Sequence, residues 1–285
     1  MGIVVNTNTA SNMVQRSLTT ATGGISKSLE RLSTGFKINR AGDDAAGLVI
    51  SQGLESQARG ASVASDNAQT GINLLQTAEG DLGVIQENLQ RIRDLSVQAA
   101  NGTYGTAERA AIKSEVQARL AEIDRTAKSS KFNTINLLDG TTGTAGSLTL
   151  QIGTNSGSTL NALDVNATTT PLGRATSSSL GIDTAPTDFF STAGKCASFI
   201  ATIDSAISTV SSRRSDIGSL QNRLESTIKS LGVKKENMEA SNSRIRDVDV
   251  AKESASLTKS QILQQASASL LAQANQAPQI ALSLI

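Results

Sequence analysis

Apolar residues recur at steps of three and four along most of this 285-residue chain, the spacing of one face of an α-helix. The clearest run alternates strictly and comprises Leu75, Ala78, Leu82, Ile85, Leu89 and Ile92. It matches a coiled-coil seam and predicts one long helix. The segment 101–106 then has turn composition with a threonine cap, and the stripe resumes at Ile112, Val116, Leu120, Ile123 and Ala127. The pattern therefore predicts a helical hairpin.

A third seam lies much later in the chain. Its members are Phe199, Ile203, Ala206, Val210, Ile217, Leu224, Ile228 and Leu231. Steps of three, four and seven between them predict another long helix that packs onto the hairpin.

Both ends of the chain are uncharged yet keep an apolar helical stripe. No charged residue occurs in 1–15 or in 260–285. The N-terminal stripe contains Leu18, Ile25, Leu29 and Leu32, and the C-terminal stripe contains Leu263, Leu270, Ala274, Ala277 and Leu284. Burying one such leucine is worth roughly 1.5–3 kcal/mol. We therefore expect both stripes to dock, either on each other or on another subunit, and self-assembly is the first functional hypothesis.

The middle of the chain has a different composition. Residues 141–163 carry no charge and are rich in Thr, Gly, Ser and Asn, with one alternating stretch at 148–152 that predicts a strand. The predicted fold is mainly α, with long coiled-coil helices from both ends forming a hairpin-like bundle and a small β or irregular insert at the tip. Six glycines lie within segments of helical periodicity and indicate either bends or close approach of packed elements: Gly47, Gly53, Gly60, Gly71, Gly80 and Gly83.

Composition removes most chemical functions. The chain has no histidine, which excludes imidazole-based catalysis, and Cys196 is its single cysteine, so no disulfide framework forms within it. Lys plus Arg number 26 against 25 for Asp plus Glu, a balance that does not favour nucleic acid. No apolar run is long enough to cross a membrane, and no general secretory signal is recognisable. We expect no enzyme activity, cofactor, metal site, nucleic-acid binding or membrane insertion.

Several motifs at the two ends carry a family resemblance. They are Val5–Asn8, Ser28–Gly35 and Ile38–Gly47 near the start, and Ala272–Gln279 and Leu282–Leu284 at the end. Together and in this order they resemble bacterial flagellin, over roughly 1–140 and 195–285. The middle, 141–194, matches no motif, and flagellins differ most there.

The resemblance implies a structural subunit that self-assembles into the flagellar filament for swimming. Residues 1–45 and 240–285 would be paired terminal helices of the filament inner core. Residues 46–140 and 195–239 would form the α-helical outer core, and 141–194 a variable, surface-exposed insert. The two terminal stripes would be the assembly interface. The implied partners are copies of the chain, the type III flagellar export apparatus, an export chaperone, and the cap and hook-junction proteins. The implied location is the extracellular filament.

The resemblance also implies recognition of the monomer by the host Toll-like receptor that senses flagellin. Arg91, Leu95 and Glu115 match the family's receptor-binding surface. The alternative is that these residues serve only packing. For the whole chain, the alternative reading is the hook–filament junction protein, which resembles flagellin at both ends but acts as an adaptor.

Overall fold

The computed structural model describes residues 8–141, 147–155, 162–166, 174–182 and 190–282. The chain divides into two compact units. Unit 1 combines Met1–Ala58 with Glu236–Ile285, and unit 2 comprises Arg59–Lys235. The predicted mainly helical architecture is confirmed, with long helices from both parts of the chain and a small strand insert.

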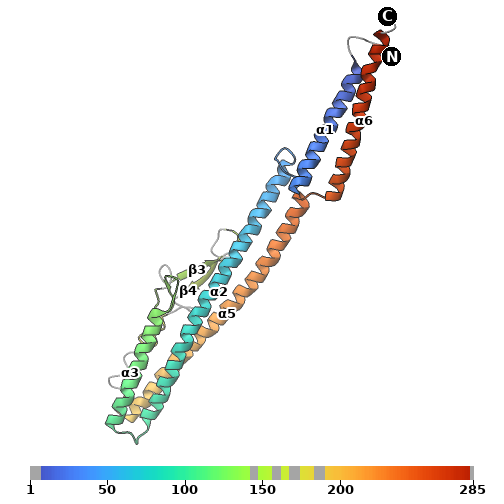
Figure 1. Ribbon diagram of the computed structural model, residues 1–285. Coiled ribbons are helices and arrows are strands. Elements are labelled where there is room, and N and C mark those ends of the chain that lie inside the picture. Colours follow the sequence, from blue (N-terminus) through green and yellow to red (C-terminus); the bar gives the residue numbers. More distant parts are fainter. Residues whose placement is uncertain (1–7, 142–146, 156–161, 167–173, 183–189, 283–285) are drawn as a thin grey trace. The chain divides into compact units, whose positions relative to one another are not determined.

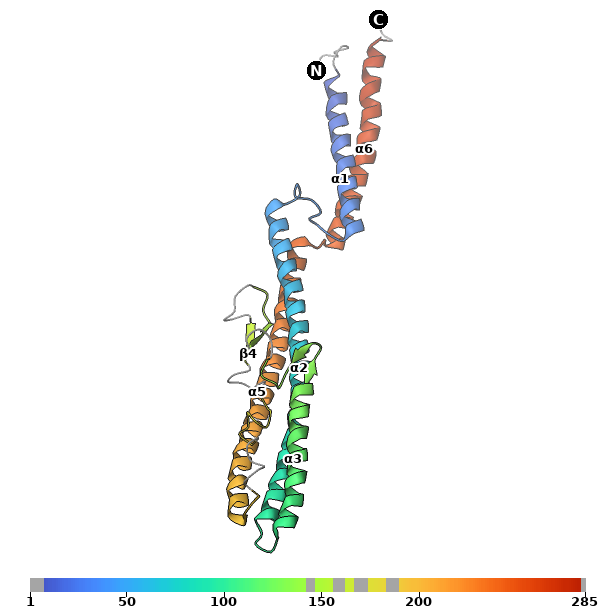
Figure 2. The same cartoon turned by 90° about the vertical axis from the view of Figure 1, so that its left-hand side faces the viewer.

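Unit 2 is built on three helices. They are α3 (Thr106–Ser129) and the greater parts of α2 (Ala45–Ala100) and α5 (Ala193–Arg246). α2 and α3 are joined by the predicted turn, in which the Tyr104 N–H donates to the carbonyl oxygen of Asn101 at 3.3 Å. α3 therefore runs back along α2, and α5 lies beside them (Figures 1 and 2).

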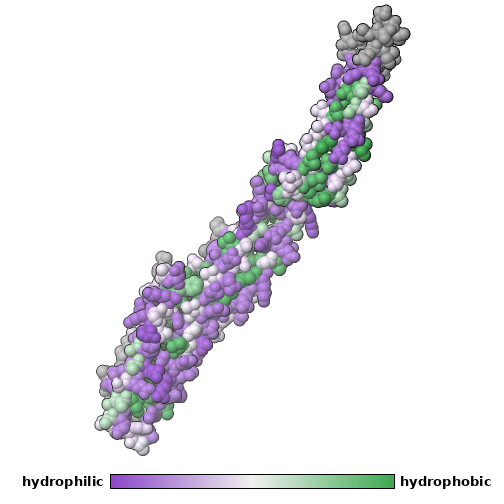
Figure 3. Space-filling view, in the orientation of Figure 1, coloured by the Kyte–Doolittle hydropathy of each residue, from purple (hydrophilic) through white to green (hydrophobic). Residues whose placement is uncertain are grey.

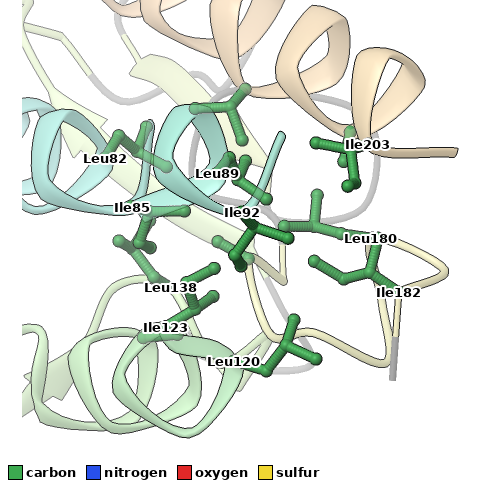
Figure 4. Close-up of a cluster of buried hydrophobic side chains, with 14 of the residues drawn as sticks. Leu82, Ile85, Leu89, Ile92, Leu120, Ile123, Leu138, Leu180, Ile182 and Ile203 are labelled. Atoms are coloured by element: carbon green, nitrogen blue, oxygen red, sulfur yellow. The ribbon is translucent and has the colours of Figure 1, made fainter. Parts of the chain in front are cut away.

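The core of unit 2 lies where the three predicted seams meet. Ile85, Leu89 and Ile92 of α2 are completely buried, as are Ile123 of α3 and Ile203 of α5. Figure 4 shows these side chains pointing toward one another. All three seams are thus confirmed, with Ile228 only partly buried at the edge of the core.

Two small antiparallel hairpins follow α3. β1 (Lys131–Phe132) pairs with β2 (Ile135–Asn136), and Asn133 between them has φ 56°. β3 (Ser147–Gln151) pairs with β4 (Ala162–Asn166), with Ser147 opposite Asn166. β3 covers most of the stretch that alternation predicted to be a strand.

The β3–β4 hairpin lies against α2, and two of the helical glycines make room for it. A Cβ on Gly71 would lie 2.6 Å from Leu150 Cδ1, and a Cβ on Gly60 would lie 3.4 Å from Thr154 Cγ2. The position differs from the expected tip of the bundle. Because α3 runs back from the turn, the chain is already alongside the middle of α2 when the insert begins (Figure 1).

The described part of 141–194 is not exposed throughout, contrary to the expectation for this insert. Ala175 and Ile182 are completely buried, and Leu180 is 8% exposed. The segment is fixed by Asp124 of α3, whose carboxylate accepts hydrogen bonds from the backbone N–H of Ser177 at 2.6 Å and from its hydroxyl at 3.0 Å. Without this segment the α2–α3–α5 core would lack one wall.

Unit 1 contains an antiparallel pair of helices, α1 (Thr9–Thr34) and α6 (Val250–Leu282). Asn8, at the start of α1, donates to the carbonyl oxygen of Ala274 at 2.8 Å, so the two terminal helices lie side by side within unit 1. Unit 1 also contains the first turns of α2 and the last turns of α5, which are joined by a hydrogen bond from Ser51 to Asn242 at 2.7 Å. The domain division at residues 45 and 240 stays a prediction about the assembled form.

Candidate functional site

The contact between α1 and α6 combines small and polar side chains with half-buried apolar ones. A Cβ on Gly24 would lie 3.0 Å from Ser260 Oγ, which shows how closely the two helices approach. Ala21 is 6% exposed and Ser267 is 8% exposed. Near the chain ends, the Ser11 hydroxyl donates to Asn275 Oδ1 at 2.9 Å. Small residues bring the helices together here, but they bury little apolar surface.

One charged group fixes the register of this pair. Glu253 of α6 accepts a 2.6 Å hydrogen bond from the buried hydroxyl of Ser28 and forms a 3.4 Å ion pair with Arg31. The Glu253 side chain is only 12% exposed. Because a buried carboxylate is costly without partners, any sliding of α6 along α1 would be opposed by the loss of these contacts.

Several of the larger apolar side chains lie outside this contact. Leu29, Leu263 and Leu270 are 52%, 49% and 52% exposed, and their neighbours Met13 and Ile262 are 63% and 60% exposed. Figure 3 shows apolar surface along α1 and α6. The α1–α6 pair thus exposes large apolar side chains, which helical spacing distributes around the two helices; we call this set, Met13, Leu29, Ile262, Leu263 and Leu270, the outer apolar face.

The remaining predicted assembly residues occupy different positions. Leu18, Ile25 and Leu32 of α1 are half-buried, as is Ala274 of α6. The side chain of Ala277 and the whole of Leu284 lie outside the described residues. The single stripe expected on each helix is therefore shared between the intrachain contact and the outer apolar face.

The loop 35–44 folds back onto α1. Gly35 ends α1 with φ 76°, and Lys27 of that helix forms a 2.8 Å ion pair with Asp43. The Lys27 ammonium and the backbone N–H groups of Arg40 and Asn39 donate hydrogen bonds to the Asp43 carboxylate. These hydrogen bonds lower the pKa of Asp43 to about 2. The neighbouring Asp44 accepts a 2.9 Å hydrogen bond from the Gly47 N–H and so caps the first turn of α2.

The connection between α5 and α6 is clasped to the same loop. Phe36 and Asp247 form an isolated β-bridge, and the Lys37 N–H donates to the carbonyl oxygen of Arg246 at 2.6 Å. The Arg246 guanidinium lies 4.3 Å from the centre of the Phe36 ring and 3.3 Å from a carboxylate oxygen of Glu55. Sequence reasoning missed this clasp, because no local pattern connects residues so far apart in the chain.

The three predicted receptor residues lie near one another in unit 2 but differ in exposure. Arg91 of α2 donates from Nε and Nη2 to Glu115 of α3, at 3.1 and 3.0 Å. Their side chains are 51% and 39% exposed. Leu95 is only 2% exposed, so a partner could not reach it in this conformation. Leu95 belongs to the core of unit 2, and the receptor-binding role of the three residues stays a prediction.

The remaining chemistry of the described residues is sparse. Cys196 is buried, and burial raises the pKa of its thiol. Within the described ranges, no cluster of three or more His, Cys, Asp or Glu side chains is placed to hold a metal ion. None of the described helices combines the length and the hydropathy that a membrane crossing requires.

The amino-acid sequence matches models of a known protein family. A model of the bacterial flagellin N-terminal helical region matches residues 5–143, and one of the flagellin C-terminal helical region matches residues 200–285. The chain is 42% identical to the flagellar filament 33 kDa core protein of Treponema phagedenis, over 99% of this chain and 100% of that protein. It is also 42% identical to a flagellin of Bacillus subtilis, with 99% of each chain covered.

A solved structure shares the fold at low sequence identity. It is a putative flagellar hook-associated protein from Vibrio parahaemolyticus, with a TM-score of 0.57 and 16% identity. The alignment covers 72% of this chain and all of that one. At this identity the similarity concerns the fold alone.

Proposed function

Because this chain belongs to the bacterial flagellin family, we propose that it polymerises into the flagellar filament by burying the outer apolar face of α1 and α6 against further copies of itself. The family consists of structural proteins, and its members are components of the extracellular filament. The proposal rests on the exposure of Leu29, Leu263 and Leu270. About half of the surface of each side chain is exposed, although α1 and α6 are closely packed against each other.

The distribution of side chains favours a contact between subunits. The intrachain contact buries Ser28 and Ser267, and it leaves Leu29, Leu263 and Leu270 about half exposed in unit 1. A single subunit therefore exposes apolar surface, and a neighbouring copy that covers it recovers part of the hydrophobic free energy. A repeated contact between different surfaces of identical chains produces an open helical assembly when it does not close into a ring.

Seeded elongation tests this function. Purified chain is added to short, sonicated filament fragments and the product is viewed by electron microscopy. We expect long, uniform tubes that grow from the fragments. A folded, helical chain that never elongates the fragments under any salt condition would contradict the role of bulk filament subunit.

The alternative of a hook–filament junction protein is not favoured. The relatives at about 42% identity that cover nearly the whole chain are named as a flagellin and a filament core protein. A junction protein would add a limited number of copies in the seeded assay, whereas a filament subunit would continue to add.

We further propose that the subunit reaches the filament through the type III flagellar export apparatus, with an export chaperone, and that it contacts the cap and hook-junction proteins there. This proposal follows from family membership and from the family's extracellular location. Comparison of culture supernatants from cells with and without a functional export apparatus tests it. Equal amounts of the chain in both supernatants would exclude this route.

Recognition by the host flagellin-sensing Toll-like receptor is a second proposal. The Arg91–Glu115 pair supports it, because it presents an exposed ion pair on adjoining helices, in which two guanidinium nitrogens donate to one carboxylate oxygen. Arg91→Ala is expected to reduce receptor activation by the monomer, while Arg93→Ala, which removes a similarly exposed ion pair with Asp204, serves as the matched control. Equal activation by wild type and Arg91→Ala would contradict the proposal.

A further inference from the structure

The turn between α2 and α3 contains an exposed Asn101–Gly102 pair, the one Asn–Gly sequence in the chain. A Cβ added to Gly102 would have no other atom within 4 Å. Backbone hydrogen bonds hold the turn on both sides of the peptide bond between the two residues. The Asn101 side chain has a carbonyl carbon, Cγ, that can react with the backbone nitrogen of Gly102. The surroundings of these two atoms decide whether the reaction is favoured.

The carbonyl of the Asn101 side chain is polarised by a backbone donor. The Thr103 N–H donates to Asn101 Oδ1 at 3.2 Å. A donor in this position withdraws electron density from Cγ and stabilises the negative charge that develops on Oδ1 when a nucleophile adds to it. The electrophilic carbon is thus activated by the turn itself.

The nucleophile is the Gly102 nitrogen, which must lose its proton. The resulting negative charge is shared with the carbonyl oxygen of Asn101, because the two atoms belong to the same peptide group. That oxygen accepts from the Tyr104 N–H at 3.3 Å and from Arg109 Nη2 at 3.5 Å. Arg109 is held in place by a second hydrogen bond, from its Nε to the carbonyl oxygen of Ala99 at 3.1 Å. Donors to this oxygen favour the deprotonated form of the nitrogen.

We propose that Asn101 is a site of spontaneous modification, at which the folded turn promotes cyclisation and deamidation. The Gly102 nitrogen gives its proton to water and forms a bond to Cγ. The side-chain nitrogen takes a proton from water, the bond from Cγ to that nitrogen breaks, and ammonia leaves. Water opens the resulting succinimide ring at either carbonyl, which yields aspartate or isoaspartate at position 101.

The product places a new carboxylate beside Arg109, at the C-terminal end of α2. A negative charge at this end of a helix opposes the helix dipole, and the adjacent guanidinium offsets that effect. The isoaspartate form also lengthens the backbone by one methylene group at the turn. The modification therefore changes both the charge and the length of the α2–α3 connection in the folded subunit.

Incubation of the full chain in heavy-oxygen water at mildly alkaline pH, followed by peptide mass spectrometry, measures this reaction. We expect label to enter at Asn101 faster in the folded chain than in the chain unfolded in urea. Asn237, an exposed residue of α5 that is followed by methionine, serves as the internal comparison and is expected to remain largely unlabelled. Slower labelling of Asn101 on folding would overturn the proposal.

Two variants separate the contributions of the turn. Gly102→Ala is expected to slow labelling in both states, since the added Cβ hinders approach of the nitrogen, and the open space around Gly102 lets this variant fold. Arg109→Gln is expected to slow labelling about two- to fivefold in the folded chain alone, the range that one exposed charged contact supplies. Lys229→Gln removes the same charge from α5 and should change nothing. An unchanged rate in Arg109→Gln would contradict the role given to the guanidinium.

Discussion

Replacing Leu263 and Leu270 together with glutamine should impair polymerisation far more than folding. Both leucines belong to α6 and are 49% and 52% exposed. A neighbouring subunit can thus bury about half of each side chain, which corresponds to roughly 0.8–1.5 kcal/mol per leucine. The double variant therefore loses about 1.5–3 kcal/mol per added subunit, equivalent to a rise of roughly 10- to 150-fold in the critical concentration for elongation.

The critical concentration is measured by sedimentation of seeded reactions over a series of subunit concentrations. Val97→Gln is the matched control, because Val97 is 49% exposed on α2 and lies outside the outer apolar face. The control should keep the critical concentration of the wild type within about twofold, since changes at exposed positions without special contacts are small. Circular dichroism of each monomer confirms that the helices are retained.

A critical concentration that stays within about twofold of the wild type in Leu263→Gln/Leu270→Gln would refute the reasoning, because that change corresponds to only ~0.4 kcal/mol. The two leucines would then remain exposed in the polymer, and the contact between subunits would lie elsewhere. A monomer that loses its helices would instead show that the leucines stabilise unit 1 itself.

The glycines of α2 should separate by their surroundings: Gly80→Ala is expected to raise the melting temperature of the monomer by about 2–4 °C, from ~1 kcal/mol of helix propensity with nothing within 4 Å of the new Cβ. Gly71→Ala should show no such gain in thermal unfolding, because its Cβ would lie 2.6 Å from Leu150 Cδ1, and an equal gain in both variants would refute the close packing. Acid should weaken the Lys27–Asp43 contact: the pKa of Asp43 is lowered from 3.8 to about 2, so its stabilising effect is present above about pH 4 and is lost as the pH falls toward 2. The melting temperature of the wild type should therefore exceed that of Asp43→Asn at pH 6 and approach it near pH 2, and a difference independent of pH would count against the ion pair.

The helical seams were readable from the sequence because they are periodic and deeply buried. Leu82, Leu89 and Ile203 lie at the expected spacing and are completely buried. The α2–α3 turn was equally clear, since its Asn–Gly and Gly–Thr steps break a strong helical pattern. In these regions local spacing and burial agree, so no long-range information was needed.

The contact between α1 and α6 could not be worked out in this way. Apolar periodicity indicated that residues such as Leu263 dock on the other terminal helix or on another subunit, whereas Ser28 and Ser267 are the residues buried within unit 1. A sequence pattern shows which residues avoid water in the final assembly, but it does not distinguish an intrachain partner from a second subunit. Small polar residues that permit close approach carry no hydropathy signal.

Contacts between residues that are far apart in the sequence could also not be predicted from local patterns. The Phe36–Arg246 clasp joins residues at opposite parts of the chain, and Ser177 is held by Asp124 through an irregular segment. Arg91 and Glu115 lie side by side in the structure, and their role in receptor binding stays a prediction. The burial of Leu95 depends on packing in three dimensions, which the motif does not encode.

Thiol footprinting of the outer apolar face shows directly whether polymerisation buries this face between subunits. Leu263→Cys and Val97→Cys are labelled with a thiol reagent as monomers and again after seeded polymerisation, and the buried Cys196 adds little background. We expect a thiol at position 263 to react readily in the monomer and to be strongly protected in the polymer, while a thiol at position 97 keeps more of its reactivity. Equal labelling of position 263 in monomer and polymer would contradict the assignment of this face to the contact between subunits.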